Sequence, residues 1–293
     1  MFGLKPTRAR NPLGPDRGEG WAGFSCGHVL SISVRDSAAM LDAIHGPEPS
    51  SPYVAPPPER PFAQEVGRDP GRLRIAFTDK SPYGDAIDPE IAAAVRGSRK
   101  PAGRARPSCR GARACAGRRS GGGDVDNRER QHRAQCAACR TALWPRHDGR
   151  RFRDIDACKR AQRAKDDARP TMSAAQLSAF QISRGLATFF ETCDVFLCPT
   201  LCSPPAARSA SSTRCRRICR ISRPILRRYM PATAMFNMSG QPAMSVPLAW
   251  NAAGLPLGMM FAARFGDEAT LFRLAAQLEQ ERPWKDRLPP ICA

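Results

Sequence analysis

Apolar residues recur every three to four positions near the C-terminus and predict a helix there. In the stretch DEATLFRLAAQLEQ, the residues with this spacing are Leu271, Leu274, Ala275 and Leu278. They form one apolar stripe, as expected for a helix that packs on a core. Asp267 and Glu268 precede the stripe, where carboxylates interact favourably with the positive end of the helix dipole.

Two further helices are predicted in the first third of the chain. The stretch SVRDSAAMLDAIHGPEP places on one helical face Val34, Ala38, Leu41 and Ile44 or His45. Gly46 followed by Pro47 is a typical helix end. A short helix opens at Asp88-Pro89-Glu90, with Asp88 as N-cap and Pro89 at the first helical position, and its pattern fails at Gly97.

A fourth helix is predicted in AAQLSAFQISRGLATFFE, which carries a wide apolar face. The members of that face are Leu177, Phe180, Leu186, Phe189 and Phe190. No internal repeat accompanies these helices.

Short apolar runs between the helices predict strands. These are LRIAFT (73–78), DVFLCPT (194–200), SVPLAW (245–250) and LPLGMMFAA (255–263), the last two joined by the turn sequence NAAG. Strands that alternate with helices are typical of α/β proteins. We therefore expect a mixed sheet flanked by helices.

The charge is concentrated in two segments. The 293 residues have a net charge of +19, yet residues 97–170 alone hold 21 Lys or Arg against 8 Asp or Glu. Residues 207–228 hold 8 Arg and no acidic residue, so these two segments carry the whole excess. They also hold 7 of the 12 cysteines and show no clear apolar periodicity.

Three interpretations of these basic segments compete. They could be solvated linkers, a disordered nucleic-acid-binding arm, or out-of-frame translation of a GC-rich coding sequence. We favour the third, because well-patterned sequence stops and restarts abruptly on both sides and linkers seldom hold seven cysteines. The first segment has few aromatic residues for base stacking, so we expect no dedicated nucleic acid partner.

The well-patterned parts resemble the amidase signature family. The similarity rests on FGLKPTRARNPLGPDRGEGW, SVRDSAAMLDAIHGPEPSSPYVAPP, FFETCDVFLCPT and the long stretch from FNMSGQPAMSVPLAW to EQERPW. The resulting organisation is an amidase-like segment (1–96), a basic segment (97–170), an amidase-like helix and strand (171–206), a second basic segment (207–228) and an amidase-like C-terminal core (229–293).

The resemblance implies a hydrolase that cleaves small-molecule amides through an acyl-enzyme, with a Ser–Ser–Lys triad and no metal or organic cofactor. In the family the triad and the Gly/Ser signature precede the FGLKPT element, which here starts at Phe2. We therefore expect no catalytic residue in this chain, a sheet incomplete at its N-terminal side, and little activity alone. A complementing N-terminal polypeptide is the partner this implies. The alternatives are a basic nucleic-acid-associated protein and an inert or partner-dependent scaffold.

The candidates for substrate contact come from NMSGQPA (237–243), which we interpret as a Gly/Pro loop and which by resemblance packs near the substrate cleft. They are Asn237, Ser239, Gly240 and Gln241. Structural support of the cleft is the simpler role for these residues. The alternative is that they form a wall of the acyl pocket. Lys5 in GLKPT is expected to be structural, His28 a loop residue and His45 the polar end of a helix.

A weak zinc alternative lies in the first basic segment, where the spacing H-x3-C-x2-C-x7-H involves His132, Cys136, Cys139 and His147. Dense cysteines make such spacings common by chance, so we expect no metal. We expect the other cysteines to be free thiols, which is typical of proteins in a reducing cytoplasm. No run of eighteen apolar residues is present, so we expect no membrane span.

Overall fold

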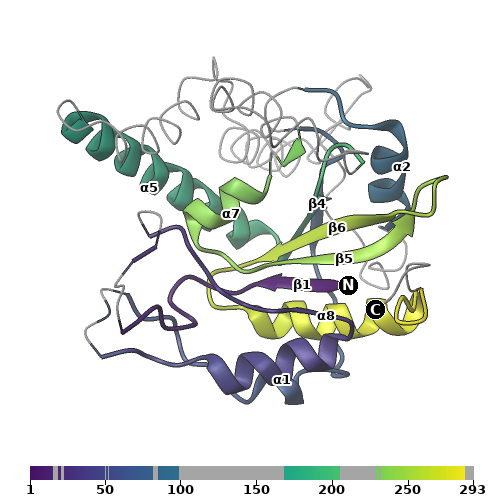
Figure 1. Ribbon diagram of the computed structural model, residues 1–293, viewed down its shortest axis with the longest axis horizontal. Helices are drawn as coiled ribbons and strands as arrows, with labels where there is room; N and C mark the ends of the chain where they lie inside the picture. Colours follow the sequence, from purple (N-terminus) through teal and green to yellow (C-terminus); the bar gives the residue numbers. More distant parts are fainter. Residues whose placement is uncertain are drawn as a thin grey trace, which may run out of the picture.

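The computed structural model describes residues 1–15, 19–20, 23–49, 51, 53–81, 85–98, 168–204, 229–230 and 232–287 (Figure 1). The strands are β1 (Phe2–Lys5), β2 (Leu30–Ser31), β3 (Ile75–Phe77), β4 (Val195–Pro199), β5 (Ala243–Trp250) and β6 (Pro256–Ala263). The helices are α1 (Val34–Ile44), α2 (Pro89–Ser98), α5 (Ala168–Thr192), α7 (Thr233–Ser239) and α8 (Glu268–Glu281), with a 3-10 turn, η1, at Phe62–Gln64.

The described strands form one six-stranded sheet in the order β2-β1-β5-β6-β4-β3. Its centre is the β5–β6 hairpin, whose turn is closed by Leu255 N–H donating to the Asn251 side chain at 2.8 Å. Strand β4 is antiparallel to β6 and parallel to β3. The sheet is therefore mixed, as the sequence predicts, and the predicted turn at NAAG is confirmed.

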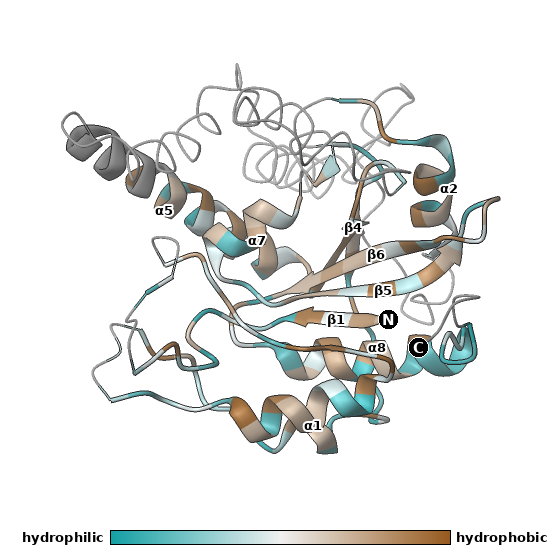
Figure 2. Cartoon of the chain, viewed as in Figure 1, coloured by the Kyte–Doolittle hydropathy of each residue, from teal (hydrophilic) through white to brown (hydrophobic). Residues whose placement is uncertain are grey.

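Side chains that alternate along the strands serve two separate cores. On β6, Met259, Phe261 and Ala263 belong to one core and Met260 and Ala262 to the other. This period of two is what a strand requires when both faces of its sheet are covered. Helices α1 and α8 cover the first face, and α5 and α7 cover the second (Figure 1). Figure 2 shows hydrophobic residues in brown along β1 and β4, as expected for strands of a sheet that is covered on both faces.

The predicted helices are present, but the predicted apolar face of α5 is too wide. The stripe of α8 is buried as predicted, and of the two residues proposed for the end of the α1 stripe, Ile44 is 36% exposed and His45 is half-buried. Ile44 lies at the edge of the stripe defined by Val34, Ala38 and Leu41. On α5, Leu186, Phe189 and Phe190 are buried but Leu177 and Phe180 are exposed. The reason is that α5 contributes its C-terminal part to the second core.

An ion-pair cluster joins three strands at one end of the sheet. Asp194, just before β4, accepts hydrogen bonds from the backbone N–H and the guanidinium of Arg74 at 2.8 to 3.1 Å. Arg264, just after β6, donates to the same carboxylate at 2.5 Å. Burial alone would raise the pKa of Asp194, but these hydrogen bonds outweigh it and lower that pKa to about 2.

Stability should therefore depend on Asp194 in acid. Its folded pKa lies below the ordinary value of 3.8, so its contribution is present above pH 4 and is lost as the pH falls toward 2. We expect Asp194→Asn to lower the free energy of unfolding at pH 7 by about 1–2 kcal/mol, since both arginines are partly exposed. Urea denaturation at pH 7 and pH 2.5 measures this.

The control for this prediction is Asp286→Asn, because the Asp286 side chain is exposed near the end of the described chain. It should change the free energy of unfolding by less than about 0.5 kcal/mol. An equal loss for Asp194→Asn at both pH values would contradict the ion-pair explanation.

Candidate functional site

The stretch predicted as a loop near the substrate cleft is the end of a helix. Asn237 and Ser239 belong to the last turn of α7, so the loop prediction is wrong for them. Gly240 ends the helix in the left-handed conformation (φ +81°), and its N–H donates to Phe236 O. A side chain at Gly240 would approach Arg8 Cβ at 3.0 Å, so glycine is required here. We call Asn237–Gln241 the α7 cap.

Arg8 holds the α7 cap in place. Its backbone N–H donates to Gly240 O at 2.9 Å, and its guanidinium donates to Asn237 O at 3.0 Å and also to Met238 O. A cation at the C-terminal carbonyls of a helix is favourable because these carbonyls carry the negative end of the helix dipole. Arg8 thus ties the turn after β1 to the predicted candidates, and sequence reasoning missed it.

Several polar atoms around the cap are buried without a hydrogen-bond partner among the described residues. They are Ser239 Oγ, Gln241 Oε1 and Arg8 Nε. The Gln241 residue is 3% exposed and Ser239 is 7% exposed. Most buried polar groups in proteins are paired, so such atoms call for a partner that the described residues do not provide. The cap can therefore bind a polar group.

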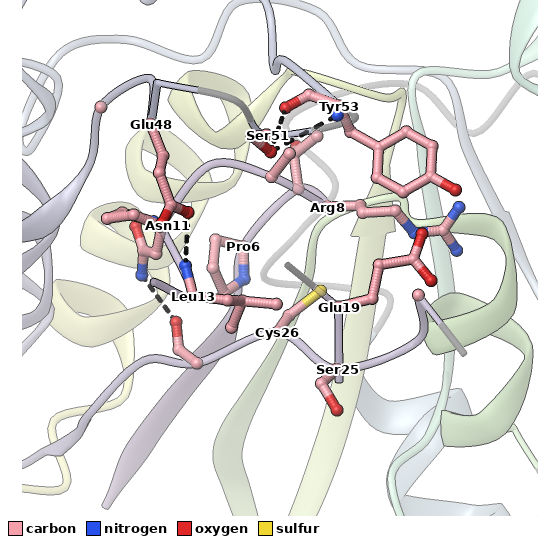
Figure 3. A pocket seen from close by; sticks show the side chains of 16 residues that line it. Pro6, Arg8, Asn11, Leu13, Glu19, Ser25, Cys26, Glu48, Ser51 and Tyr53 are labelled. Atoms are coloured by element: carbon pink, nitrogen blue, oxygen red, sulfur yellow. Dashed lines mark hydrogen bonds between the residues drawn. The ribbon is translucent and has the colours of Figure 1, made fainter. Parts of the chain in front are cut away.

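Arg8 also lines a cavity of about 30 Å³, which has room for one or two water molecules. The walls come from the turn after β1, from Glu19, Gly23 and Ser25–Gly27, and from Gly46, Glu48, Ser51 and Tyr53. Figure 3 shows Arg8, Glu19, Cys26 and Tyr53 among its lining side chains. A hydrogen bond with Glu19 raises the pKa of the Tyr53 hydroxyl.

Lys5 lies at the end of β1, beside this cavity. Its Nζ donates to Pro6 O at 2.6 Å and to Cys26 Sγ at 3.8 Å. Burial lowers the pKa of Lys5 below its ordinary value. Lys5 is the last residue of a strand, and the side chain it contacts is a cysteine and not a serine.

The two described histidines have packing roles. His28 Nε2 lies 2.9 Å from Ser37 Oγ, which joins the loop before β2 to α1, and burial lowers the pKa of His28. His45, which caps α1, packs edge-on against Phe62 with ring centres 5.4 Å apart. The candidates His132, Cys136, Cys139 and His147 lie outside the described residues. Within the described ranges, no group of three potential metal ligands occurs.

A buried ion pair fixes the turn that carries Arg8. Arg10 donates to both oxygens of Glu268, at 3.1 and 2.9 Å, and the two side chains are 2% and 0% exposed. Thr7 N–H donates to the same carboxylate at 2.8 Å. Burial alone would raise the pKa of Glu268, but the bonds from Arg10 and Thr7 outweigh it and lower that pKa. The sequence predicted Glu268 at the start of the helix, but it did not predict that Glu268 forms a buried ion pair.

The fold agrees with what comparison with known proteins shows. The amidase family model matches residues 1–101 and 150–272, so this chain belongs to the amidase family. The basic stretch 102–149 lies outside the match. None of the described helices is long and apolar enough to cross a bilayer.

The curated relatives include a 6-aminohexanoate-cyclic-dimer hydrolase from Pseudomonas sp. (strain NK87). It is 30% identical over 99% of this chain, which spans 61% of that relative's length. A putative amidase of Mycobacterium tuberculosis, AmiB2, is 31% identical over 99% of the chain and 59% of its own length. A solved structure of a 6-aminohexanoate cyclic dimer hydrolase superposes with a TM-score of 0.69, with 28% identity over 99% of this chain and 62% of that one.

Proposed function

We propose that this chain provides one part of the active site of an amide hydrolase that cleaves carboxamide C–N bonds through an acyl-enzyme. The observation that carries the proposal is the α7 cap, where Gln241 and Ser239 are buried with unpartnered polar atoms. A secondary amide presents one N–H donor and one C=O acceptor. The Gln241 carbonyl can accept from the first and the Ser239 hydroxyl can donate to the second.

The substrate we propose is a small-molecule amide, and the chemistry itself needs no metal or organic cofactor. The 6-aminohexanoate cyclic dimer named for the Pseudomonas relative is the first compound to assay. Since the four described cysteines outside the basic segments are free thiols, we also propose a reducing compartment such as the cytoplasm.

We further propose that the nucleophile comes from outside this chain. Two observations support this. Lys5, the lysine beside the cavity, contacts Pro6 O and Cys26 Sγ. The chain also spans about three fifths of the length of the curated relatives described above. The chain would then be the supporting part of the site, and a complementing N-terminal polypeptide would bring the triad.

The purified chain alone should show no hydrolysis of a panel of amides that includes 6-aminohexanoate cyclic dimer. The reason is that loss of a catalytic triad typically costs about 10⁴- to 10⁶-fold in rate. Product formation followed by chromatography measures it. Turnover that survives purification and disappears in Lys5→Ala would contradict the proposal and make Lys5 catalytic.

A further inference from the structure

Cys26 and Lys5 form a pair that the proposed amide hydrolysis does not use. They are 21 residues apart in the sequence, and the fold brings the ammonium nitrogen to 3.8 Å from the sulfur. Cys26 is partly exposed and lines the cavity beside Arg8 (Figure 3). Lys5 is the last residue of β1. A thiol next to an amine at the wall of a cavity is the arrangement that activates a cysteine.

Both partners are held in position. The loop that carries Cys26 is fixed on either side, because Asn11 donates to Gly27 O at 2.6 Å and Ser25 N–H donates to Gly20 O at 3.1 Å. Lys5 Nζ is held in place because it donates a hydrogen bond to Pro6 O at 2.6 Å. The contact between Lys5 and Cys26 therefore follows from the backbone geometry around the cavity.

The geometry points to Cys26 as a site of thiol–disulfide exchange with low-molecular-weight disulfides, with Lys5 as its positioning residue. The Lys5 amine takes the thiol proton, and the Cys26 thiolate attacks one sulfur of the small disulfide. The S–S bond of the reagent breaks as the new S–S bond to Cys26 forms. The departing thiolate receives a proton from the Lys5 ammonium, so Cys26 is oxidised and half of the reagent is reduced to a thiol.

The charges around the sulfur favour this reaction. Arg8 lines the same cavity and places a cation at its wall. Two carboxylates also line the cavity, but each has a hydrogen-bond partner. Glu48 accepts a hydrogen bond from Leu13 N–H at 3.1 Å, and Glu19 is hydrogen-bonded to Tyr53. Burial lowers the pKa of Lys5, so a larger fraction of its side chain is the neutral amine that can take the thiol proton.

The other described cysteines serve as internal controls. Cys193, Cys198 and Cys202 are at most 3% exposed. Burial raises the pKa of both Cys198 and Cys202, the latter to about 11. Neither feature favours attack on a disulfide. This inference is independent of amide hydrolysis, since it concerns a thiol that the proposed chemistry leaves unused.

The test treats the reduced full chain with a limiting amount of glutathione disulfide and maps the modified cysteines by peptide mass spectrometry over time. Native Cys26 should react at least about tenfold faster than Cys198 and Cys202. It should also react faster in the folded chain than in urea, although unfolding exposes it fully. Slower reaction of Cys26 in the folded chain than in urea would overturn the proposal.

A variant separates activation from exposure. Lys5→Met should slow the reaction of Cys26 by about tenfold while Cys198 stays slow, which shows that the fold is intact. Lys5→Arg retains a cation and should fall between the two. An unchanged Cys26 rate in a folded Lys5→Met chain would also overturn the proposal. Should Lys5→Met make Cys198 reactive, the comparison of folded and urea-unfolded wild type decides the question.

Discussion

Replacing Glu268 with glutamine is expected to lower the free energy of unfolding by about 3–5 kcal/mol, because it leaves the buried Arg10 guanidinium without its counter-charge. The pair makes two hydrogen bonds, and Glu268 also accepts from Thr7 N–H. Urea denaturation at pH 7, followed by tryptophan fluorescence, measures the loss.

The matched controls separate burial from charge. The double variant Arg10→Met/Glu268→Leu should lose less than the sum of its single variants, since no unpaired charge is left buried. The exposed pair Arg35–Asp36, with side chains 79% and 58% exposed, should contribute less than about 1 kcal/mol. A Glu268→Gln chain within about 1 kcal/mol of wild type would contradict a buried, structurally important pair.

The second large effect is expected at the centre of the sheet. Phe261 on β6 is fully buried and is paired across the sheet with Met244 on β5 and Leu197 on β4. Phe261→Ala should cost about 3–5 kcal/mol, because it loses buried apolar area and leaves a cavity between well-packed neighbours. The same urea denaturation reports this loss.

Phe180→Ala on α5 is the control for this deletion. Phe180 is 52% exposed, so the same truncation should change the free energy of unfolding by less than about 1 kcal/mol. Equal losses for Phe261→Ala and Phe180→Ala would mean that the first core does not have the packing described above.

Much of the fold follows from local patterns. The strand β4 is a short apolar run bounded by Asp194 and Pro199, and α8 has both an apolar stripe and an N-cap, with Asp267 accepting from Thr270 N–H at 3.1 Å. Each signal lies within a few residues of the element it defines. The apolar pattern does not show how much of a helix lies over the core. For this reason the burial predicted for Leu177 and Phe180 on α5 was wrong.

The site is less predictable because its contacts join distant parts of the chain. Arg8 is 229 residues from Asn237, and Arg10 is 258 residues from Glu268. Nothing in the local sequence distinguishes these arginines from the others. The short helix α7 was also missed, because the glycine and proline after Ser239 are turn signals and a seven-residue helix has too few turns to show a period.

We propose above all that this chain supplies the α7 cap but not the nucleophile of an amide hydrolase. The most direct test is to co-express this chain with the part of the Pseudomonas relative that the match leaves out and to isolate the complex. Hydrolysis of 6-aminohexanoate cyclic dimer by that complex is then measured. The account predicts turnover by the complex and none by either part alone. It also predicts that Gln241→Leu lowers turnover by at least about tenfold, since one polar contact to the substrate is lost. An isolated complex without turnover, or a Gln241→Leu complex as active as the unchanged one, would contradict it.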